Sequence, residues 1–377
     1  MPIKKLVSII LAVIIACSTL ITGFTFNELS KDILIKTSTI PNNINKYASS
    51  YFDGLKYDYL LDLGFTEQVI PELKLSKGFI PYEYDDCDAP LFYFPITGGK
   101  SVLAMIRIAD LGTKGYSVQM GKSELSDSLS KLDPEIYSLI ITDYGMFSIS
   151  KNNKLSLLES YYFAENEGLN KEEIPFPNIR FNEITYNNPE TINIAKQTLS
   201  NLRNANDVSN SPSRANKALS VPFVPNMATT DYPAGVCWAA AAASIIKYKK
   251  ITFKTATTIR DEIINKGYTA TYPNITNKMA DEIDDYLLLS TPHITTTMSF
   301  SNVQAKIDGY KPIYTTWLSS DGPGHVLVIR SYELDSNGNQ SVGFMDCNYS
   351  YYTAMTFGTS FVNGTKIYTW VDSIYLG

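Results

Sequence analysis

The chain has 377 residues, of which 44% are hydrophobic, 12% aromatic and 19% charged. This composition excludes a disordered or coiled-coil protein, and the length predicts two globular domains. The 32 Lys and Arg residues are outnumbered by 38 Asp and Glu residues, so the net charge is −6. With no basic surplus to collect phosphates, we expect no nucleic-acid partner.

The cysteines and histidines are too few and too scattered for a structural metal site. A structural zinc site normally takes four such ligands, which occur in closely spaced pairs. The chain has two histidines and four cysteines, and the cysteines, at positions 17, 87, 237 and 347, form no closely spaced pairs in the sequence. We therefore expect no metal, and we expect no organic cofactor either.

The first residues have a composition typical of an export signal. Two lysines precede an apolar run, which predicts a signal peptide over residues 1–23 and a secreted or cell-surface protein. A membrane anchor is the alternative, because residues 6–24 just reach spanning length. Lipidation at Cys17 is a third reading, because residues 14–17 resemble a loose bacterial lipoprotein box. The apolar stretch continues past Cys17, which argues mildly against lipidation.

The composition changes near the middle of the chain. All three tryptophans and both histidines follow residue 235. Residues 201–218 are polar and rich in Asn and Ser, which predicts a linker. We therefore expect an N-terminal pro-domain or accessory domain over residues 24–200 and a second domain over residues 219–377.

The N-terminal domain is expected to be α+β. Apolar runs at residues 91–96 and 101–108 flank a pair of glycines, which predicts a β-hairpin. We find no chemical motif in this domain. Further strands are expected at residues 117–120 and 146–149, with a helix at 123–132 between them.

The C-terminal domain shows helices first and antiparallel strands second, which is an α+β order. The alanines at 239–243 predict a helix from Cys237 to about Tyr248. A turn at 336–339 predicts a hairpin between two of the strands. Further helices are expected at residues 258–266, 277–289 and 301–308, and strands at 313–318, 326–333, 342–346 and 366–375.

Cys237 is the candidate nucleophile. It begins the predicted helix, where the positive end of the helix dipole stabilises a thiolate over a thiol. The alternative is a buried cysteine that only fills space, as most free cysteines do.

His325 is the candidate base. It follows a glycine-rich turn and begins an apolar strand, which predicts an imidazole at the edge of a cleft. The other histidine, His293, lies in a threonine-rich stretch without a glycine-rich turn before it or an apolar strand after it. Cys237 and His325 would form a nucleophile–base pair.

A third residue must accept a hydrogen bond from the imidazole. Asp346 ends the strand that pairs with the strand of His325, and Asn348 lies two residues further on. We favour Asp346, because the apolar run stops there. Either residue is also a plausible cap of a turn without a catalytic role.

These residues lie in blocks that resemble those of papain-like cysteine peptidases. Residues 235–240 (GVCWAA), 324–328 (GHVLV) and 344–346 (FMD) are similar to the Cys, His and Asp/Asn blocks. The resemblance covers residues 219–377 and is nearest to the short bacterial members: streptopain, staphopain and the bacteriocin-leader peptidases. The intervals of 88 and 21 residues between the three candidates suit such a minimal domain.

The resemblance implies a fold, an activity and a partner. The helix that carries Cys237 would pack on an antiparallel sheet. Cys237 would attack a carbonyl of a peptide or protein substrate, His325 would carry the proton to the leaving amine, and water would hydrolyse the thioester. The N-terminal domain would be a pro-domain that covers the cleft, released by cleavage in the linker.

One position departs from the family. The family places a glutamine six residues before the cysteine as a donor to the oxyanion, and this chain has Asp231 there. An ionised carboxylate cannot donate, so the donor would be a protonated Asp231, Asn226, Thr229 or Thr230, beside the backbone N–H of Cys237. Two alternatives to a peptidase remain for this domain: a transglutaminase-like acyl transfer with the same triad, or a binding module that has lost activity.

Overall fold

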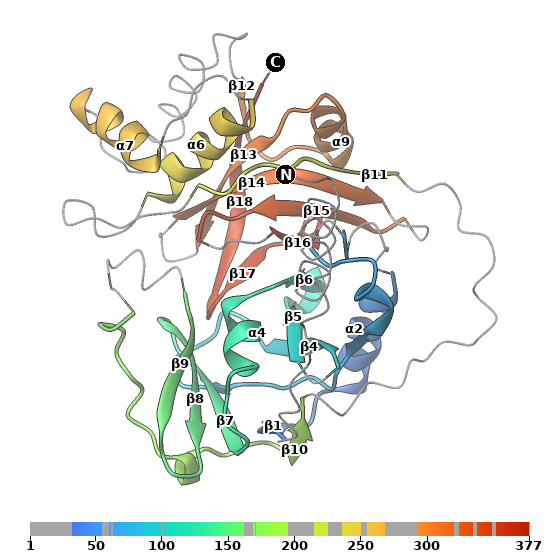
Figure 1. The fold of residues 1–377 in the computed structure, drawn as a ribbon, viewed down its shortest axis with the longest axis vertical. Coiled ribbons are helices and arrows are strands. Elements are labelled where there is room, and N and C mark those ends of the chain that lie inside the picture. Colours follow the sequence, from blue (N-terminus) through green and yellow to red (C-terminus); the bar gives the residue numbers. More distant parts are fainter. Residues whose placement is uncertain are drawn as a thin grey trace, which may run out of the picture. The chain divides into compact units, whose positions relative to one another are not determined.

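The computed structural model describes most of the chain beyond Ile33, and residues Ile33–Gly377 form one compact unit (Figure 1). No helix among these described residues is long and apolar enough to cross a membrane. The predicted signal peptide, Cys17 and the predicted helix at 277–289 lie outside the description. The described residues are 32–54, 60–61, 63–99, 101–161, 169, 171–194, 215–224, 236–249, 255–267, 293–319, 324–334, 338–348 and 352–376.

The fold is α+β, with two mostly antiparallel sheets. The smaller, six-stranded sheet follows the order β10-β1-β7-β8-β9, and β3 pairs with β7. All of it comes from the N-terminal half, and β1 and β3 each run parallel to β7. Its strands are β1 (Leu34–Ser38), β3 (Tyr82–Glu83), β7 (Ile136–Ile141), β8 (Gly145–Ser150), β9 (Leu155–Ser160) and β10 (Pro189–Asn193).

The larger sheet has twelve strands and contains both halves of the chain. Its order is β12-β18-β13-β14-β15-β16-β6-β5-β4-β2, while β11 pairs with β14 and β17 with β18. The N-terminal strands are β2 (Leu73–Leu75), β4 (Leu91–Gly98), β5 (Ser101–Asp110) and β6 (Tyr116–Gly121). The C-terminal strands are β11 (Ala215–Ala218), β12 (His293–Thr295), β13 (Ile313–Ser319), β14 (Gly324–Leu334), β15 (Gln340–Met345), β16 (Tyr352–Thr356), β17 (Phe361–Asn363) and β18 (Lys366–Tyr375).

The predicted hairpin of the N-terminal half is confirmed by the antiparallel pair β4 and β5. Gly99 turns the chain between them in the left-handed region, at a φ of 62°, where glycine is unstrained. Successive residues of β4 point to opposite faces, so Leu91 and Tyr93 enter one core while Phe92 and Phe94 enter another. A strand buried on both faces reads as a continuous apolar run, and β4 has that pattern.

The helices of the N-terminal half cover these two cores. Helix α2 (Asn42–Gly54) buries Ile44 and Ala48 in one of them, and α4 (Glu124–Leu129) buries Leu125 and Leu129 in the other. The Ser123 hydroxyl caps α4 by accepting from the backbone N–H of Ser126. Three short 3-10 helices complete this half: Ile70–Glu72, Gly112–Lys114 and Phe181–Glu183.

The helices of the C-terminal half lie against the larger sheet. Helix α6 (Cys237–Lys249) contacts β14 and β13, α7 (Ala256–Asn265) contacts α6, and α9 (Phe300–Asp308) contacts β14 and β11. Nine residues of α6 are buried, including the five consecutive alanines. Small side chains let this helix approach the sheet closely. The predicted helices at 237–248, 258–266 and 301–308 are confirmed within two residues at each end.

The twelve-stranded sheet contains strands from both predicted domains. Strand β16 pairs with β6 in the register Ala354↔Met120. The last four residues of the predicted linker form β11, which pairs with β14, while residues 201–214 lie outside the description. Separate domains over 24–200 and 219–377 therefore stay a prediction, and the two regions share one sheet.

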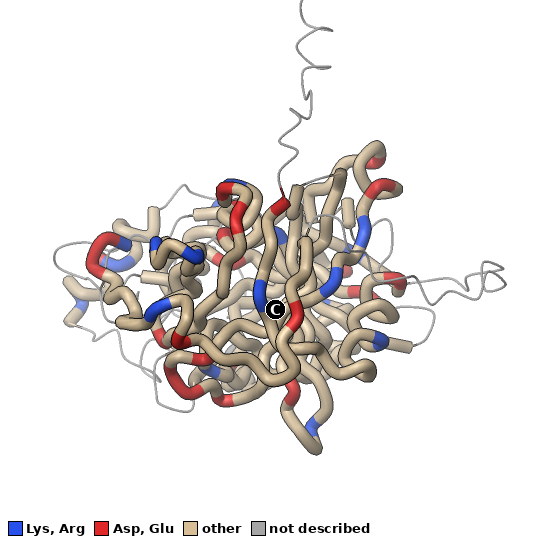
Figure 2. The backbone as a smooth tube through the Cα atoms, turned by 90° about the horizontal axis from the view of Figure 1, so that it is seen from below, with Lys and Arg blue, Asp and Glu red and all other residues tan. Residues whose placement is uncertain are grey.

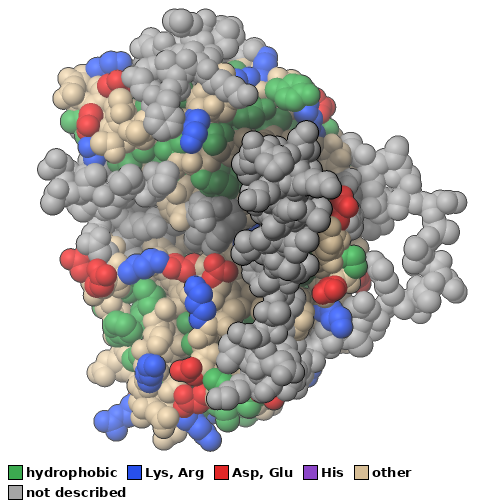
Figure 3. Space-filling model, viewed as in Figure 1, with side chains coloured by type: hydrophobic (Ala, Val, Ile, Leu, Met, Phe, Trp, Pro, Cys, Tyr) green, Lys and Arg blue, Asp and Glu red, His purple; other side chains and the backbone are tan. Residues whose placement is uncertain are grey.

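The surface carries charges of both signs. Figure 2 shows acidic and basic residues interspersed along the backbone. Figure 3 shows charged side chains scattered across one face, with small groups of hydrophobic side chains between them. The arrangement agrees with the modest net charge of −6.

Candidate active site

Cys237 is the first residue of α6 and is half-buried. The first backbone N–H groups of a helix have no partner within it and carry a partial positive charge. The sequence puts a thiol at this position and follows it with alanines, which are strong helix formers. The local structure therefore supplies what a cysteine nucleophile needs: partial exposure and a positive end of a helix.

His325 lies at the start of β14 and is 3% exposed. It is opposite Trp317 in the β13–β14 pair, and Trp317 stacks on Trp370 with ring centroids 5.7 Å apart. The preceding residue, Gly324, is packed tightly: a Cβ there would lie 3.0 Å from Leu318 Cδ2 and 3.2 Å from the Trp317 carbonyl oxygen. The glycine lets the chain carry the imidazole this close to β13.

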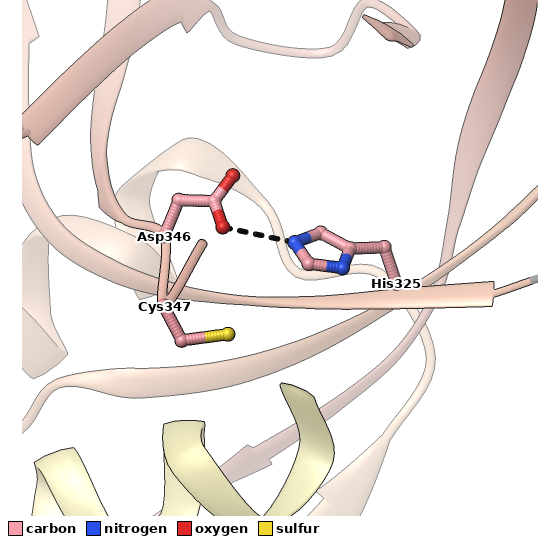
Figure 4. A group of neighbouring side chains, drawn as sticks. All are labelled: His325, Asp346 and Cys347. Carbon is pink, nitrogen blue, oxygen red and sulfur yellow. Dashed lines mark hydrogen bonds and ion pairs between the residues drawn. The ribbon is translucent and has the colours of Figure 1, made fainter. Parts of the chain in front are cut away.

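Asp346 comes directly after β15, the antiparallel neighbour of β14, and is 1% exposed. Its Oδ1 atom lies 3.0 Å from Nε2 of His325 (Figure 4). The same Oδ1 accepts a hydrogen bond from the backbone N–H of Asn348 at 3.0 Å. The turn after β15 thus fixes the carboxylate through a backbone contact, and the carboxylate in turn holds the ring.

The pKa of His325 is strongly shifted. Burial alone would lower it, but the Asp346 carboxylate and its hydrogen bond, followed by a hydrogen bond and charge interaction with Cys237, raise the pKa of His325 to about 10. The imidazole is therefore protonated at neutral pH. Because Nε2 is hydrogen-bonded to Asp346, the other ring nitrogen, Nδ1, remains for the thiol of Cys237.

Cys347 is a member of this cluster that sequence reasoning missed. It is 5% exposed, and its Sγ atom lies 3.8 Å from the carbonyl oxygen of Cys237. Ligand atoms of His325, Asp346 and Cys347 all lie within 4.8 Å of one another. Its position next to Asp346 was the available signal, but no spacing rule predicts that the turn reaches the start of α6.

Tyr314 of β13 is a second missed neighbour. Its side chain is fully buried, and its hydroxyl has no hydrogen-bond partner among the described residues. Burial raises the pKa of Tyr314 well above its ordinary value of 10.0, and the nearby thiols of Cys237 and Cys347 raise it further. Tyr314 therefore stays a neutral phenol beside the two sulfur atoms.

The remaining predicted residues are distributed as follows. His293 begins β12, which two strands, β18 and β13, separate from the strand of His325. Asn348 lies on the turn that holds Asp346, with its Oδ1 atom 3.6 Å from the Sγ atom of Cys347. The candidate oxyanion donors lie outside the described residues: Asn226, Thr229, Thr230 and Asp231.

A comparison with protein families agrees with this geometry. The model of the Peptidase_C39 like family matches residues 218–368. The match supports a papain-like cysteine peptidase domain at the C-terminus. The matched segment contains Cys237, His325 and Asp346, and it leaves the N-terminal half uncovered. No curated protein matches the chain.

Proposed function

We propose that this protein is the exported precursor of a papain-like cysteine endopeptidase, with Cys237 as nucleophile, His325 as acid and base, and Asp346 as the residue that orients His325. The observation that carries the proposal is the hydrogen bond of 3.0 Å between His325 Nε2 and Asp346 Oδ1, on a ring that also contacts Cys237. A nucleophile, a base and a group that orients the base are the recurring parts of this chemistry.

In the proposed reaction each of the three groups has one role. The Cys237 sulfur, with its proton on His325, attacks the carbonyl carbon of the scissile peptide bond. The imidazolium then gives its proton to the leaving amine, and a thioester remains on Cys237. A water molecule, deprotonated by His325, attacks the thioester carbon and releases the carboxylic acid and the thiol.

The developing oxyanion needs donors that are already in place. The backbone N–H of Cys237 lies at the N-terminus of α6 and is one such donor. For the second we propose Asn226, Thr229, Thr230 or a protonated Asp231, which precede α6 in the chain. An ionised Asp231 in that place would weaken catalysis by repelling the negative charge.

Export and control belong to the same proposal. The apolar start of the chain supports secretion or attachment to the cell surface, with or without a lipid at Cys17. The N-terminal half would act as a pro-domain on the peptidase, and Arg203, Arg214 and Lys217 in the predicted linker offer cleavable bonds. The pro-domain hypothesis fails if the exported protein keeps its N-terminal half and is fully active.

Peptide hydrolysis by the full chain tests the proposal. Wild type and Cys237→Ala, each before and after limited proteolysis in the linker, are incubated under reducing conditions with a mixture of unmodified peptides, and new termini are identified by mass spectrometry. We expect cleavage by wild type and by a Cys87→Ala variant, and none by Cys237→Ala. Cys87 is the matched control, because it carries a thiol in the N-terminal half.

The alternatives give different results in the same experiment. Incorporation of an added primary amine in place of hydrolysis would identify transglutaminase-like acyl transfer. Cleavage that persists in Cys237→Ala would exclude Cys237 as the nucleophile. Binding of peptides without any covalent chemistry would leave the inactive binding module as the function.

A further inference from the structure

Two thiols face one imidazole in the candidate active site. Cys237 forms a hydrogen bond with the side chain of His325. Cys347 approaches the same ring from the turn after β15, with a ligand atom of each residue within 4.8 Å (Figure 4). The peptidase mechanism uses Cys237 and assigns no role to Cys347. The Sγ atom of Cys347 nevertheless lies 3.8 Å from the carbonyl oxygen of Cys237.

The cluster has the chemistry of a zinc site. Thiolates and imidazoles are the preferred ligands of Zn²⁺, with bonds of about 2.3 Å to sulfur and about 2.0 Å to nitrogen. Tetrahedral ligand atoms around Zn²⁺ are therefore about 3.5 Å apart. Ligand atoms of His325, Asp346 and Cys347 lie within 4.8 Å of one another, so side-chain movements of about 1 Å would bring Cys347 and His325 to that separation. Cys237, which forms a hydrogen bond with His325, would supply the third ligand.

The hydrogen bond to Asp346 completes the resemblance to a metal site. A histidine that binds a metal usually donates its other ring N–H to a carboxylate, which fixes the ring and its tautomer. Asp346 holds Nε2 of His325 in this way, so that loss of the second ring proton leaves a lone pair on Nδ1. We place Cys237 on the Nδ1 side of the ring, because Nε2 is bonded to Asp346 and Cys237 also forms a hydrogen bond with the ring.

We propose that Cys237, Cys347 and Nδ1 of His325 form a binding site for Zn²⁺, which silences the peptidase reversibly. The inference rests on the proposed function, because it takes Cys237 as the nucleophile that the metal blocks. Cys347 and the imidazolium each lose a proton on binding, because the proton of Cys237 already resides on His325. Two thiolates, one Zn²⁺ ion and a neutral imidazole sum to zero charge, which suits side chains as buried as His325 and Cys347.

Cobalt binding tests the site without any assay of activity. Co²⁺ replaces Zn²⁺ in tetrahedral sites, and the intensity of its sulfur-to-metal charge-transfer absorption reports the number of bound thiolates. The reduced, chelator-treated full chain, with Cys17→Ser in every sample, is titrated with Co²⁺, and Zn²⁺ is then added. We expect a signal of two thiolates that Zn²⁺ abolishes in a ratio of one metal ion per chain.

Variants assign the ligands. Cys347→Ser and Cys237→Ser should each reduce the signal to that of one thiolate, and His325→Gln should weaken Zn²⁺ binding by at least about tenfold. Cys87→Ser should bind as the parent does. Circular dichroism of each variant shows whether it is folded. Cys347→Ala provides a second variant at this position, because a serine hydroxyl is itself a weak metal ligand.

Two results would overturn the inference: a cobalt signal of two thiolates that persists in Cys347→Ser and Cys347→Ala, or no thiolate signal in a folded, reduced wild type. Inhibition adds a separate readout, with each variant compared with its own rate in the presence of chelator. Zn²⁺ should inhibit wild type at concentrations at least about tenfold lower than Cys347→Ser. If the chain proves to have no peptidase activity, the cobalt titration still decides whether the metal site exists.

Discussion

The two parts of the twelve-stranded sheet are built differently. In the N-terminal part, β4 and β5 are covered on both faces by apolar cores, and their buried charged pair is Arg107 with Glu159. In the C-terminal part, one apolar core backs the sheet, while His325 and Asp346 lie at the ends of β14 and β15, beside the start of α6. The candidate site residues lie where strand ends meet the N-terminus of a helix.

The charged groups of the two parts also differ in what they are suited to do. Burial raises the pKa of Glu159, and Arg107 lowers it again through its charge and hydrogen bond. That pair lies wholly within the N-terminal half and has no nucleophile in it. His325 and Asp346 are almost fully buried, but their cluster includes the half-exposed thiol of Cys237. Access to a nucleophile separates a reactive cluster from a structural one.

The junction between the parts joins them firmly. Besides the β6–β16 pairing, Val362 packs in a core of the N-terminal half, and the backbone N–H of Ile367 donates to Asp88. Arg107 and Glu159 line a small cavity together with Asp346. The N-terminal half thus forms the wall behind the candidate active site. Cleavage of the linker alone would leave the two pieces associated through this surface.

The largest expected effect comes from the imidazole. His325→Ala should lower kcat/KM by at least about 10³-fold, because the base and the counter-ion of the thiolate are both lost. His293→Ala is the matched control, since two strands lie between that of His293 and that of His325, and it should retain activity. Steady-state kinetics on a peptide substrate measure both variants. Equal losses would show that the two histidines are not distinguished by their place in the sheet.

The junction of the two parts can be broken at Met120. Met120 of β6 is 1% exposed and lies opposite Ala354 of β16. Met120→Ala should destabilise the protein by about 2–5 kcal/mol, the cost of a buried cavity. Because the sheet is continuous, urea unfolding followed by tryptophan fluorescence should show one cooperative transition at a lower midpoint. All three tryptophans lie in the C-terminal half, so an unchanged midpoint would mean that the halves unfold independently.

The choice between Asp346 and Asn348 can be sharpened by two matched variants. Asp346→Ala should lower kcat/KM by about 10²-fold, since the imidazole loses the acceptor that orients it. Asn348→Ala keeps the backbone N–H that Asp346 accepts and should lower kcat/KM by less than about tenfold. A larger loss in Asn348→Ala than in Asp346→Ala would reverse the assignment.

The charge of Asp346 should also be visible in the pH dependence of stability. His325 has an ordinary pKa of 6.5 that rises to about 10 in the folded protein, so the folded state holds a proton that the unfolded state loses. The resulting stabilisation is complete below pH 6.5 and is lost as the pH rises towards 10. The free energy of unfolding of wild type should therefore approach that of Asp346→Asn between these values. A constant difference between the two curves would contradict the pKa shift.

The smallest expected effect concerns the turn into β14. Gly324→Ala puts a Cβ against Leu318 and the Trp317 backbone, so it should cost about 1–3 kcal/mol and move His325 enough to lower kcat. Gly338→Ala is the control: it has open space around it and a φ of 83°, so it should cost about 1 kcal/mol without affecting kcat. Thermal unfolding and kinetics of both variants separate strain from displacement of the ring.

Much of the fold could be predicted from local patterns, because its long strands are apolar runs. The apolar runs of β4, β5, β13 and β14 predict strands, and the consecutive alanines of α6 predict a helix. The pairing of β6 with β16 could not be predicted, since it joins residues more than 230 positions apart and neither strand carries a mark of its neighbour. Strand β11 was assigned to a linker because its four residues, ANKA, lack an apolar alternation.

The candidate site shows the same division. Cys237, His325 and Asp346 were predicted because each occupies a recognisable place at the end of an element. Cys347 and Tyr314 were not, because their roles depend on which side chains the folded sheet brings to the start of α6. A tyrosine within an apolar strand looks like any core residue until its neighbours are known.

The most direct test of the account is alkylation of the full chain with iodoacetamide at pH 6, with the modified cysteine located by mass spectrometry. An ordinary thiol, with a pKa of about 8.5, reacts very slowly at that pH. We expect iodoacetamide to label Cys237 fast in wild type and slowly in His325→Ala, and to label Cys87 slowly in both proteins. Labelling of Cys237 at the same slow rate in wild type and His325→Ala would contradict an activated Cys–His pair.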